Sequence, residues 1–101
     1  MIEKIVELVK ANLQNPEFNV KSLADMLFMS QPTLYRKVKQ ITGFTIIELV
    51  RGVRLKEAAE LLKTKQYGIQ EVSEMVGYND VPTFRKHFVS LYGTTPSTFV
   101  G

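Results

Sequence analysis

The chain has 101 residues, 45% of them hydrophobic, which suffices for the core of one small domain and excludes a multidomain enzyme. It has no cysteine and a single histidine, His87, which excludes disulfide frameworks, thiolate or multi-histidine metal sites and cysteine nucleophiles. No apolar run approaches the roughly 20 residues that span a bilayer, and the first ten residues mix charged and aliphatic side chains, unlike a signal peptide. We therefore expect a cytoplasmic protein with no metal, no other cofactor and no membrane contact.

The positive charge is concentrated in two parts of the chain. Net charge is +3, from 13 Lys and Arg against 10 Asp and Glu. The windows 31–42 and 81–92 contain no acidic residue but five basic ones, namely Arg36, Lys37, Lys39, Arg85 and Lys86. The remaining 77 residues hold eight basic and ten acidic side chains, a net charge of −2. This distribution indicates an anionic partner for the two windows.

Helical periodicity begins at the N-terminus. The first helix is predicted from five aliphatic residues at three- and four-residue steps and is expected to end at Asn15-Pro16; they are Ile2, Ile5, Val6, Val9 and Leu13. A short second helix is expected after the N-cap Asn19, with Phe18 and Leu23 placed as a hydrophobic staple. No β pattern of useful length appears anywhere in the chain.

A third helix is predicted over residues 31–42. Ser30 is its N-cap, and Gly43 ends it, because glycine suits the left-handed residue that follows a helix. Its inward face is predicted to consist of Leu34, Val38 and Ile41. The opposite face then carries basic and aromatic side chains and points to solvent, since each residue turns the helix by about 100°.

Four more helices complete the prediction. Thr45 and Glu48 form a capping box that opens a long helix over 46–63, and a fifth helix follows over 69–76. A sixth helix begins after Asp80 and stops at Gly93, with a core face of Phe84, Phe88 and Leu91. A last short helix is capped at Thr95-Pro96 and ends near Phe99. The fold is therefore expected to be all-α, with about seven helices.

The two halves of the chain repeat one pattern. Val20, Leu23 and Met26 match Ile69, Val72 and Met75 at an offset of 49. The turn of the second half is one residue longer, so the offset after it is 50. At this offset eight residues of the first half match eight of the second. They are Ser30, Pro32, Thr33, Leu34, Val38, Ile41, Gly43 and Thr45, which match Asp80, Pro82, Thr83, Phe84, Phe88, Leu91, Gly93 and Thr95 in that order. Each half is a short helix, a tight turn and a longer basic helix, which is the helix-turn-helix arrangement.

These repeats predict the domain organisation. One domain over 1–101 is expected to hold a first helix-turn-helix subdomain over about 1–44, a central helix over about 45–63 and a second subdomain over about 64–101. An α-helix fits the major groove of DNA, and arginine can bond both major-groove acceptors of guanine. The 18-residue central helix is about 27 Å long, not far short of the roughly 34 Å of one DNA turn. One chain can therefore place two recognition helices in successive major grooves.

Several segments carry a specific resemblance. They are LADMLFMSQPTLYRKVKQITG, VRLKEAAELL, IQEVSEMVGY, FRKHF and YGTTP, with Arg54-Leu55-x-x-Ala58, Gly77-Tyr78 and Gly93-x-Thr95-Pro96 at characteristic spacings. Together, from about Asn19 to Phe99, they resemble the DNA-binding domain of AraC/XylS-type transcription regulators. The sensor or receiver domain of that family is absent here. The chain is therefore either a stand-alone regulator or a fragment of a longer protein that supplies a sensor or dimerisation domain.

The resemblance implies a function and candidate site residues. It implies sequence-specific binding of double-stranded DNA by a monomeric domain, with RNA polymerase as a further partner and activation commoner than repression. The implied base-reading residues are Gln31, Pro32, Tyr35 and Arg36 in the first unit and Val81, Pro82, Thr83, Arg85 and Lys86 in the second. Lys37 and Lys39 are the candidates for phosphate contact.

Three positions depart from the pattern or have another use. Val89 stands where many family members have lysine, so the second unit either loses a phosphate contact or meets a thymine methyl group there. Ser73 replaces the usual alanine at a close helix contact, where its hydroxyl can bond a backbone carbonyl. Arg54 is expected to be structural, paired to a neighbouring carboxylate rather than to a base.

Two other classes of function fit the sequence less well. A helical interaction module could use the basic faces to bind an acidic protein partner, but it gives no reason for two capped, acid-free helices. An enzyme is not expected, because the sequence has no phosphate-binding glycine loop, no paired catalytic carboxylates and no nucleophile with a neighbouring base.

Overall fold

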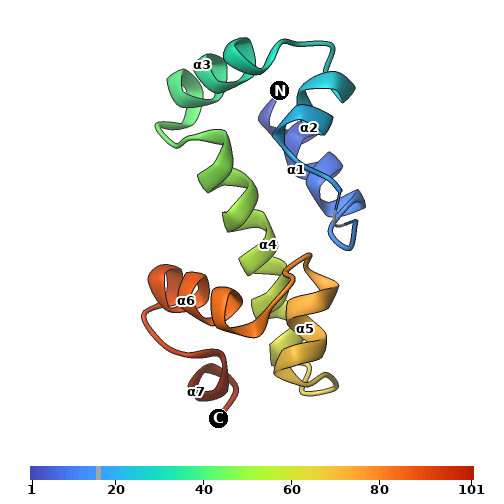
Figure 1. Ribbon diagram of the computed structural model, residues 1–101. Helices are drawn as coiled ribbons and strands as arrows, with labels where there is room; N and C mark the ends of the chain where they lie inside the picture. Colours follow the sequence, from blue (N-terminus) through green and yellow to red (C-terminus); the bar gives the residue numbers. More distant parts are fainter. Residues whose placement is uncertain (16) are drawn as a thin grey trace. The chain divides into compact units, whose positions relative to one another are not determined.

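The computed structural model describes residues 1–15 and 17–101, and all regular secondary structure in these ranges is helical. Seven helices follow one another (Figure 1): α1 (Ile2–Ala11), α2 (Val20–Met26), α3 (Gln31–Thr42), α4 (Ile46–Lys63), α5 (Ile69–Met75), α6 (Val81–Tyr92) and α7 (Pro96–Val100). The prediction of an all-α fold with about seven helices is confirmed. In the described ranges no helix has both the length and the apolar character needed to cross a membrane.

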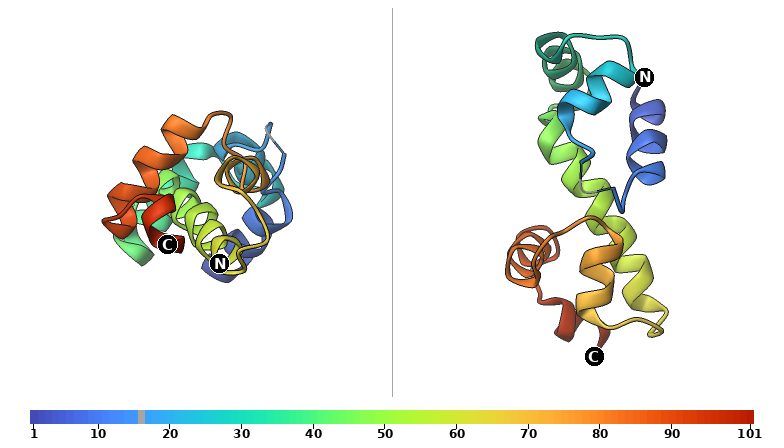
Figure 2. Two further views of the ribbon diagram at one scale, coloured as in Figure 1. Left: turned by 90° about the horizontal axis from the view of Figure 1, so that it is seen from below. Right: turned by 45° about the vertical axis from the view of Figure 1, so that its right-hand side comes forward.

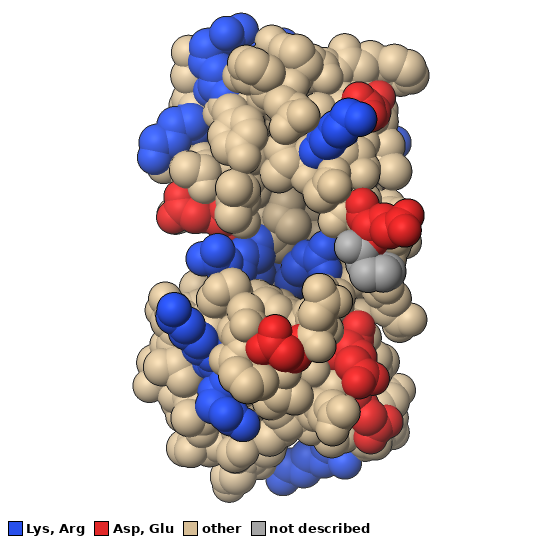
Figure 3. Space-filling view, viewed as in Figure 1, with Lys and Arg blue, Asp and Glu red and all other residues tan. Residues whose placement is uncertain are grey.

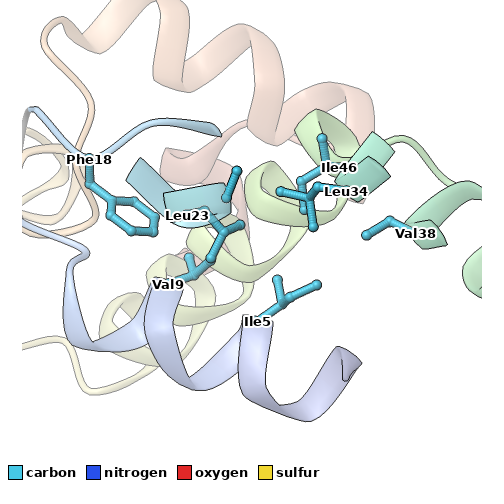
Figure 4. Packing of buried hydrophobic residues seen from close by; sticks show 8 residues of the cluster. Ile5, Val9, Phe18, Leu23, Leu34, Val38 and Ile46 are labelled. Carbon is cyan, nitrogen blue, oxygen red and sulfur yellow. The ribbon is translucent and has the colours of Figure 1, made fainter. Parts of the chain in front are cut away.

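The chain divides into two compact units within α4, unit 1 (Met1–Val53) and unit 2 (Arg54–Gly101). Unit 1 has a core to which α1, α2, α3 and the start of α4 all contribute. Its buried residues are Ile5, Val9, Phe18, Leu23, Ala24, Leu34, Val38 and Ile46. Figure 4 shows the labelled side chains of this cluster, with Phe18 coming from the segment before α2 and the others from the four helices. Each helix of the unit is therefore oriented by the apolar stripe that its sequence supplies.

Unit 2 has its own core, which is richer in aromatic side chains. Its buried residues are Leu55, Ala58, Ala59, Leu62, Val72, Val76, Phe84 and Phe88. The Phe88 ring lies 4.7 Å from the Tyr92 ring and 5.3 Å from the Phe99 ring, measured between centroids. These separations are favourable for aromatic pairs. The Phe88–Phe99 contact holds α7 against α6, whereas Tyr92 belongs to α6 itself, and the two helices lie next to each other in Figure 2.

The helix ends follow the local sequence. The side chain of Asn19 accepts a hydrogen bond from Ser22 N, and those of Ser30, Asp80 and Thr95 accept from the backbone N–H three residues on. The capping box at the start of α4 is present in both directions, since Thr45 N donates to Glu48 Oε1 at 3.0 Å and Glu48 N donates to Thr45 Oγ1 at 3.1 Å. Each such cap satisfies backbone groups that the helix leaves unpaired.

The tight turns of the two repeats have the same hydrogen bonds. Met29 N donates to Ala24 O at 3.0 Å in unit 1, and Tyr78 N donates to Ser73 O at 2.9 Å in unit 2. The residue before each donor is left-handed, with φ of +57° at Phe28 and +92° at Gly77. Glycine adopts this conformation without strain, whereas phenylalanine costs about 1–2 kcal/mol. The sequence repeat therefore corresponds to a structural repeat, although only unit 2 has glycine in the turn.

Four sequence expectations need correction or qualification. The first helix ends at Ala11, before the expected stop, and Pro16 lies outside the described residues. The fifth helix ends at Met75, with Val76 as its C-cap. Ile41 and Leu91, placed in the core by periodicity, are 60% and 53% exposed. Both lie in the last turn of a 12-residue helix whose partner has only seven residues, so the longer helix extends beyond the core it covers.

Replacing either of two glycines by alanine should change the stability of the protein, in opposite directions for the two positions. Gly52 lies inside α4 with no atom within 4 Å of an added Cβ, so Gly52→Ala should stabilise the protein by about 0.5–1 kcal/mol. Gly43 has equally open surroundings but φ of +79°, so Gly43→Ala should destabilise it by about 1–2 kcal/mol. Urea denaturation of both variants measures the difference, and destabilisation by both to the same extent would contradict these backbone conformations.

Candidate nucleic-acid interface

The rotation of α3 is determined by two buried side chains one turn apart. Leu34 and Val38 have no exposed surface and pack in the core of unit 1. The predicted contact residues consequently face solvent. All six are exposed: Gln31, Pro32, Tyr35, Arg36, Lys37 and Lys39. In Figure 3, Lys and Arg side chains lie along this helix.

Helix α6 presents its predicted residues in the same way. Phe84 and Phe88 are fully buried in unit 2 and hold one side of the helix inward. Four of the predicted residues are exposed, namely Pro82, Thr83, Arg85 and Lys86, and Val81 is half-buried at the first helical position. Figure 3 shows Lys and Arg side chains over α6 and acidic side chains of the unit gathered toward α5. Unit 2 therefore exposes a basic helix face of its own.

The starts of the two helices differ in charge. A helix N-terminus bears partial positive charge and favours an anion such as phosphate. The cap of α3 is the neutral Ser30, whereas the cap of α6 is Asp80, whose carboxylate accepts from Thr83 N at 2.7 Å. This hydrogen bond lowers the pKa of Asp80 below its ordinary value of 3.8, so the group is ionised at neutral pH. The start of α3 is therefore the more favourable of the two for a phosphate.

Lys39 has a structural contact in addition to its predicted role. Its ammonium Nζ donates to the carbonyl of Gly43 at 2.8 Å, so it caps the C-terminal end of α3. Hydrogen bonding with Thr45 lowers the pKa of Glu48, and the charges of Lys39 and Arg51 contribute to the same shift. An ammonium has three donors, so this contact leaves capacity for a phosphate oxygen. Phosphate contact by Lys39 stays a prediction.

Arg54 supports the turn of unit 2 rather than an exposed face. Its Nη1 donates to the carbonyl of Val76 at 2.8 Å, and burial of the guanidinium lowers its pKa. Arg54 therefore has a structural contact, to a backbone carbonyl, and its expected pairing with a carboxylate stays a prediction. The buried Ser73 hydroxyl donates to Gln70 O at 2.7 Å, which confirms the arrangement predicted for it. Both bonds satisfy polar groups around the α5–α6 turn.

A further contact at this turn was not predicted from the sequence. Tyr78 Oη and His87 Nδ1 lie 2.9 Å apart and share a hydrogen bond, and the Tyr78 ring also packs edge-on against Phe84 at 5.3 Å. The pair joins the turn to the outer side of α6. Helical periodicity cannot indicate such a contact, because the two residues belong to different elements. In the described ranges, no group of three or more His, Asp or Glu residues is placed to hold a metal ion.

Comparison with known proteins identifies the family. A family model described as a helix-turn-helix domain matches residues 23–101, which include the second repeat and all but the start of the first. PqrA of Proteus vulgaris, described as a probable transcription factor, is 31% identical over 100 residues, covering 98% of this chain and 82% of PqrA. The chain belongs to the AraC-type helix-turn-helix family. Members of this family are DNA-binding transcription regulators, and the resemblance drawn from the sequence motifs is confirmed.

A solved structure of another relative has the same fold, and the curated relatives differ from this chain in length. The DNA-binding domain of the global transcriptional factor AdpA, solved in complex with a target DNA, is 26% identical with a TM-score of 0.87, covering 98% of this chain and 88% of that one. YesN of Bacillus subtilis, an uncharacterized transcriptional regulatory protein, is 35% identical over 102 residues, covering 98% of this chain. The chain spans 28% of YesN, and between 7% and 29% of the first curated relatives it matches.

The cap of α6 should give the protein an acid-sensitive component of stability. Because the folded state lowers the pKa of Asp80, its contribution is present above pH 3.8 and is lost as pH falls through the lower folded value. Asp80→Asn retains a capping oxygen but does not titrate there. When the pH is lowered from 7 to 3, the melting temperature of the variant, measured by circular dichroism, should therefore fall less than that of the unmodified protein. Equal losses would show that this carboxylate does not contribute.

Proposed function

We propose that this domain recognises a bipartite sequence in double-stranded DNA, with α3 and α6 as recognition helices in successive major grooves. The observation that carries the proposal is the repeated pair of capped 12-residue helices, each with a buried apolar side and an exposed, acid-free basic side. The 18 residues of α4 correspond to about 27 Å of helix, against roughly 34 Å for one turn of DNA. The membership in a family of DNA-binding transcription regulators supports the same function.

Within this proposal the candidate contact residues fall into two groups, those that contact bases and those that contact phosphate. Arg36 and Arg85 are assigned to guanine, whose N7 and O6 accept both donors of a guanidinium, and Gln31 to the major-groove edge of adenine. Pro32, Tyr35, Val81, Pro82, Thr83 and Lys86 complete the base-facing set. Lys37 and Lys39 are assigned to phosphate, which contributes affinity without sequence preference.

The remaining parts of the proposal follow from the family. We assign RNA polymerase as a further partner of the DNA-bound domain and a monomeric state to the isolated domain. No catalytic activity is assigned, because regulation through DNA binding requires none. A regulator of this kind acts where the chromosome lies, so its place is the cytoplasm, at the nucleoid.

The decisive experiment is selection of bound sequences from a pool of randomised duplex DNA at moderate salt. Two enriched half-sites with centres about 10–10.5 base pairs apart are expected, since one helical turn returns the major groove to the same face. Enrichment of a single half-site would contradict base recognition by both helices. If no sequence is enriched and duplex is not retained in a salt-sensitive manner, an acidic protein partner becomes the better hypothesis.

Two neighbouring residues of α3 test the division between base and phosphate contacts. Arg36→Ala should weaken binding to the selected duplex by about 1–3 kcal/mol and relax the preference at one or two base pairs of one half-site. Lys37→Ala should instead weaken binding to all sequences and reduce the salt dependence by about one unit. Fluorescence anisotropy titrations at several salt concentrations measure both. Equal losses for Arg36→Ala on every sequence would reassign this residue to phosphate.

A further inference from the structure

We propose that α6 recognises thymine methyl groups on either side of a guanine, through Val81 and Val89 flanking Arg85. The inference rests on the proposed function and specifies the base preference of the second recognition helix. The three residues are four positions apart, so successive members rise about 6 Å along the helix and rotate by only about 40°. They form one stripe along α6, with an apolar side chain at each end and a cation in the middle.

The core of unit 2 does not account for the two valines. Phe84 and Phe88 fill the buried side of α6, and the valines are not among the described partly buried residues that pack against this core, which are Leu61, Ile69, Tyr78, Tyr92, Phe99 and Val100. Val89 remains 38% exposed. Valine is also a weaker helix former than the lysine at the matching position of α3. Neither packing nor helix propensity therefore explains an apolar side chain at position 89.

The internal repeat provides a comparison within one chain. The stripe of α3 that corresponds to Val81, Arg85 and Val89 consists of Gln31, Tyr35 and Lys39. The Lys39 ammonium caps its own helix at the Gly43 carbonyl, 2.8 Å away, a contact that a valine has no donor to make. The two units thus share a backbone arrangement but present different chemistry at the same three positions.

The stripe of α6 matches one arrangement of bases. Among the four bases only thymine projects a methyl group into the major groove, and apolar side chains contact it there. Arginine between the two valines fits the acceptors of guanine. A half-site for α6 therefore contains thymines around a guanine, whereas the polar stripe of α3 selects a different half-site. Unequal half-sites give the operator a direction, so the domain binds it in one orientation.

Deoxyuridine tests the methyl contacts directly, because it differs from thymidine only by that methyl group. The probe is the duplex recovered from the randomised pool, with thymines replaced by deoxyuridine in one half-site at a time. The half-site of α6 is the one whose base preference Arg85→Ala relaxes. Replacement there should weaken binding about fourfold for each contacted thymine, the ratio expected for one lost buried methyl. The same replacement should have a smaller effect on the Val89→Ala domain.

A second variant separates a methyl contact from a phosphate contact. Val89→Lys introduces the residue of α3 at the equivalent position, so it should lose the part of the deoxyuridine sensitivity that comes from Val89, retain the part that comes from Val81, and gain about one unit of salt dependence. Circular dichroism melts of both variants check that the fold is retained. No effect of deoxyuridine in the α6 half-site, or an equal effect on the unmodified protein and Val89→Ala, would overturn the inference while leaving the proposed function intact. Failure to recover any enriched duplex would instead overturn both.

Discussion

The exposed basic faces depend on the burial of two large apolar side chains, four residues apart, on each long helix. Leu34 and Val38 hold α3 in the core of unit 1, and Phe84 and Phe88 hold α6 in the core of unit 2. A helix anchored along one stripe cannot rotate without exposing that stripe to water, at a cost of about 1.5–3 kcal/mol per side chain. The side chains on the opposite stripe, including Arg36 and Arg85, are thereby held toward solvent.

The internal repeat shows which features the helix-turn-helix fold requires. Both units have a capped long helix, a left-handed turn residue and the same backbone hydrogen bond across the turn. The chemical identity of several positions is free to vary within that framework. The turn residue is Phe28 in one unit and Gly77 in the other, and the cap is Ser30 or Asp80. Such differences leave the order of the helices and the hydrogen bond across the turn unchanged, while they alter charge and exposed apolar surface.

These differences give the two units unequal properties. In unit 1 the long helix α3 has a neutral N-cap and three Lys or Arg residues. In unit 2 the long helix α6 has an ionised N-cap and two Lys or Arg residues. Phosphate contact is therefore favoured more strongly at α3, while α6 offers a mixed apolar and cationic stripe. In this arrangement α3 contributes more to electrostatic affinity and α6 more to base recognition. Such a division suits a single chain that binds an asymmetric site.

Most helix boundaries of this protein, and the exposed sides of its two long helices, follow from the local sequence. Helix caps at Ser30 and Asp80, the stop at Gly43 and the 18-residue span of α4 are determined by residues within a few positions of one another, so pattern analysis identifies them. The outward placement of Arg36 and Arg85 also follows, because the helical period and two buried neighbours determine it. Motif spacing was sufficient to indicate the AraC-type family.

Only the tertiary structure decided where each core ends and which distant groups meet. Ile41 and Leu91 satisfy the apolar period but lie in last turns that the shorter partner helices do not cover. The bonds from Arg54 to the Val76 carbonyl and between Tyr78 and His87 join residues of different elements. Periodicity describes one helix at a time. Which residues are covered and which polar groups pair depends on the lengths and packing of neighbouring helices, and these are set when the helices assemble.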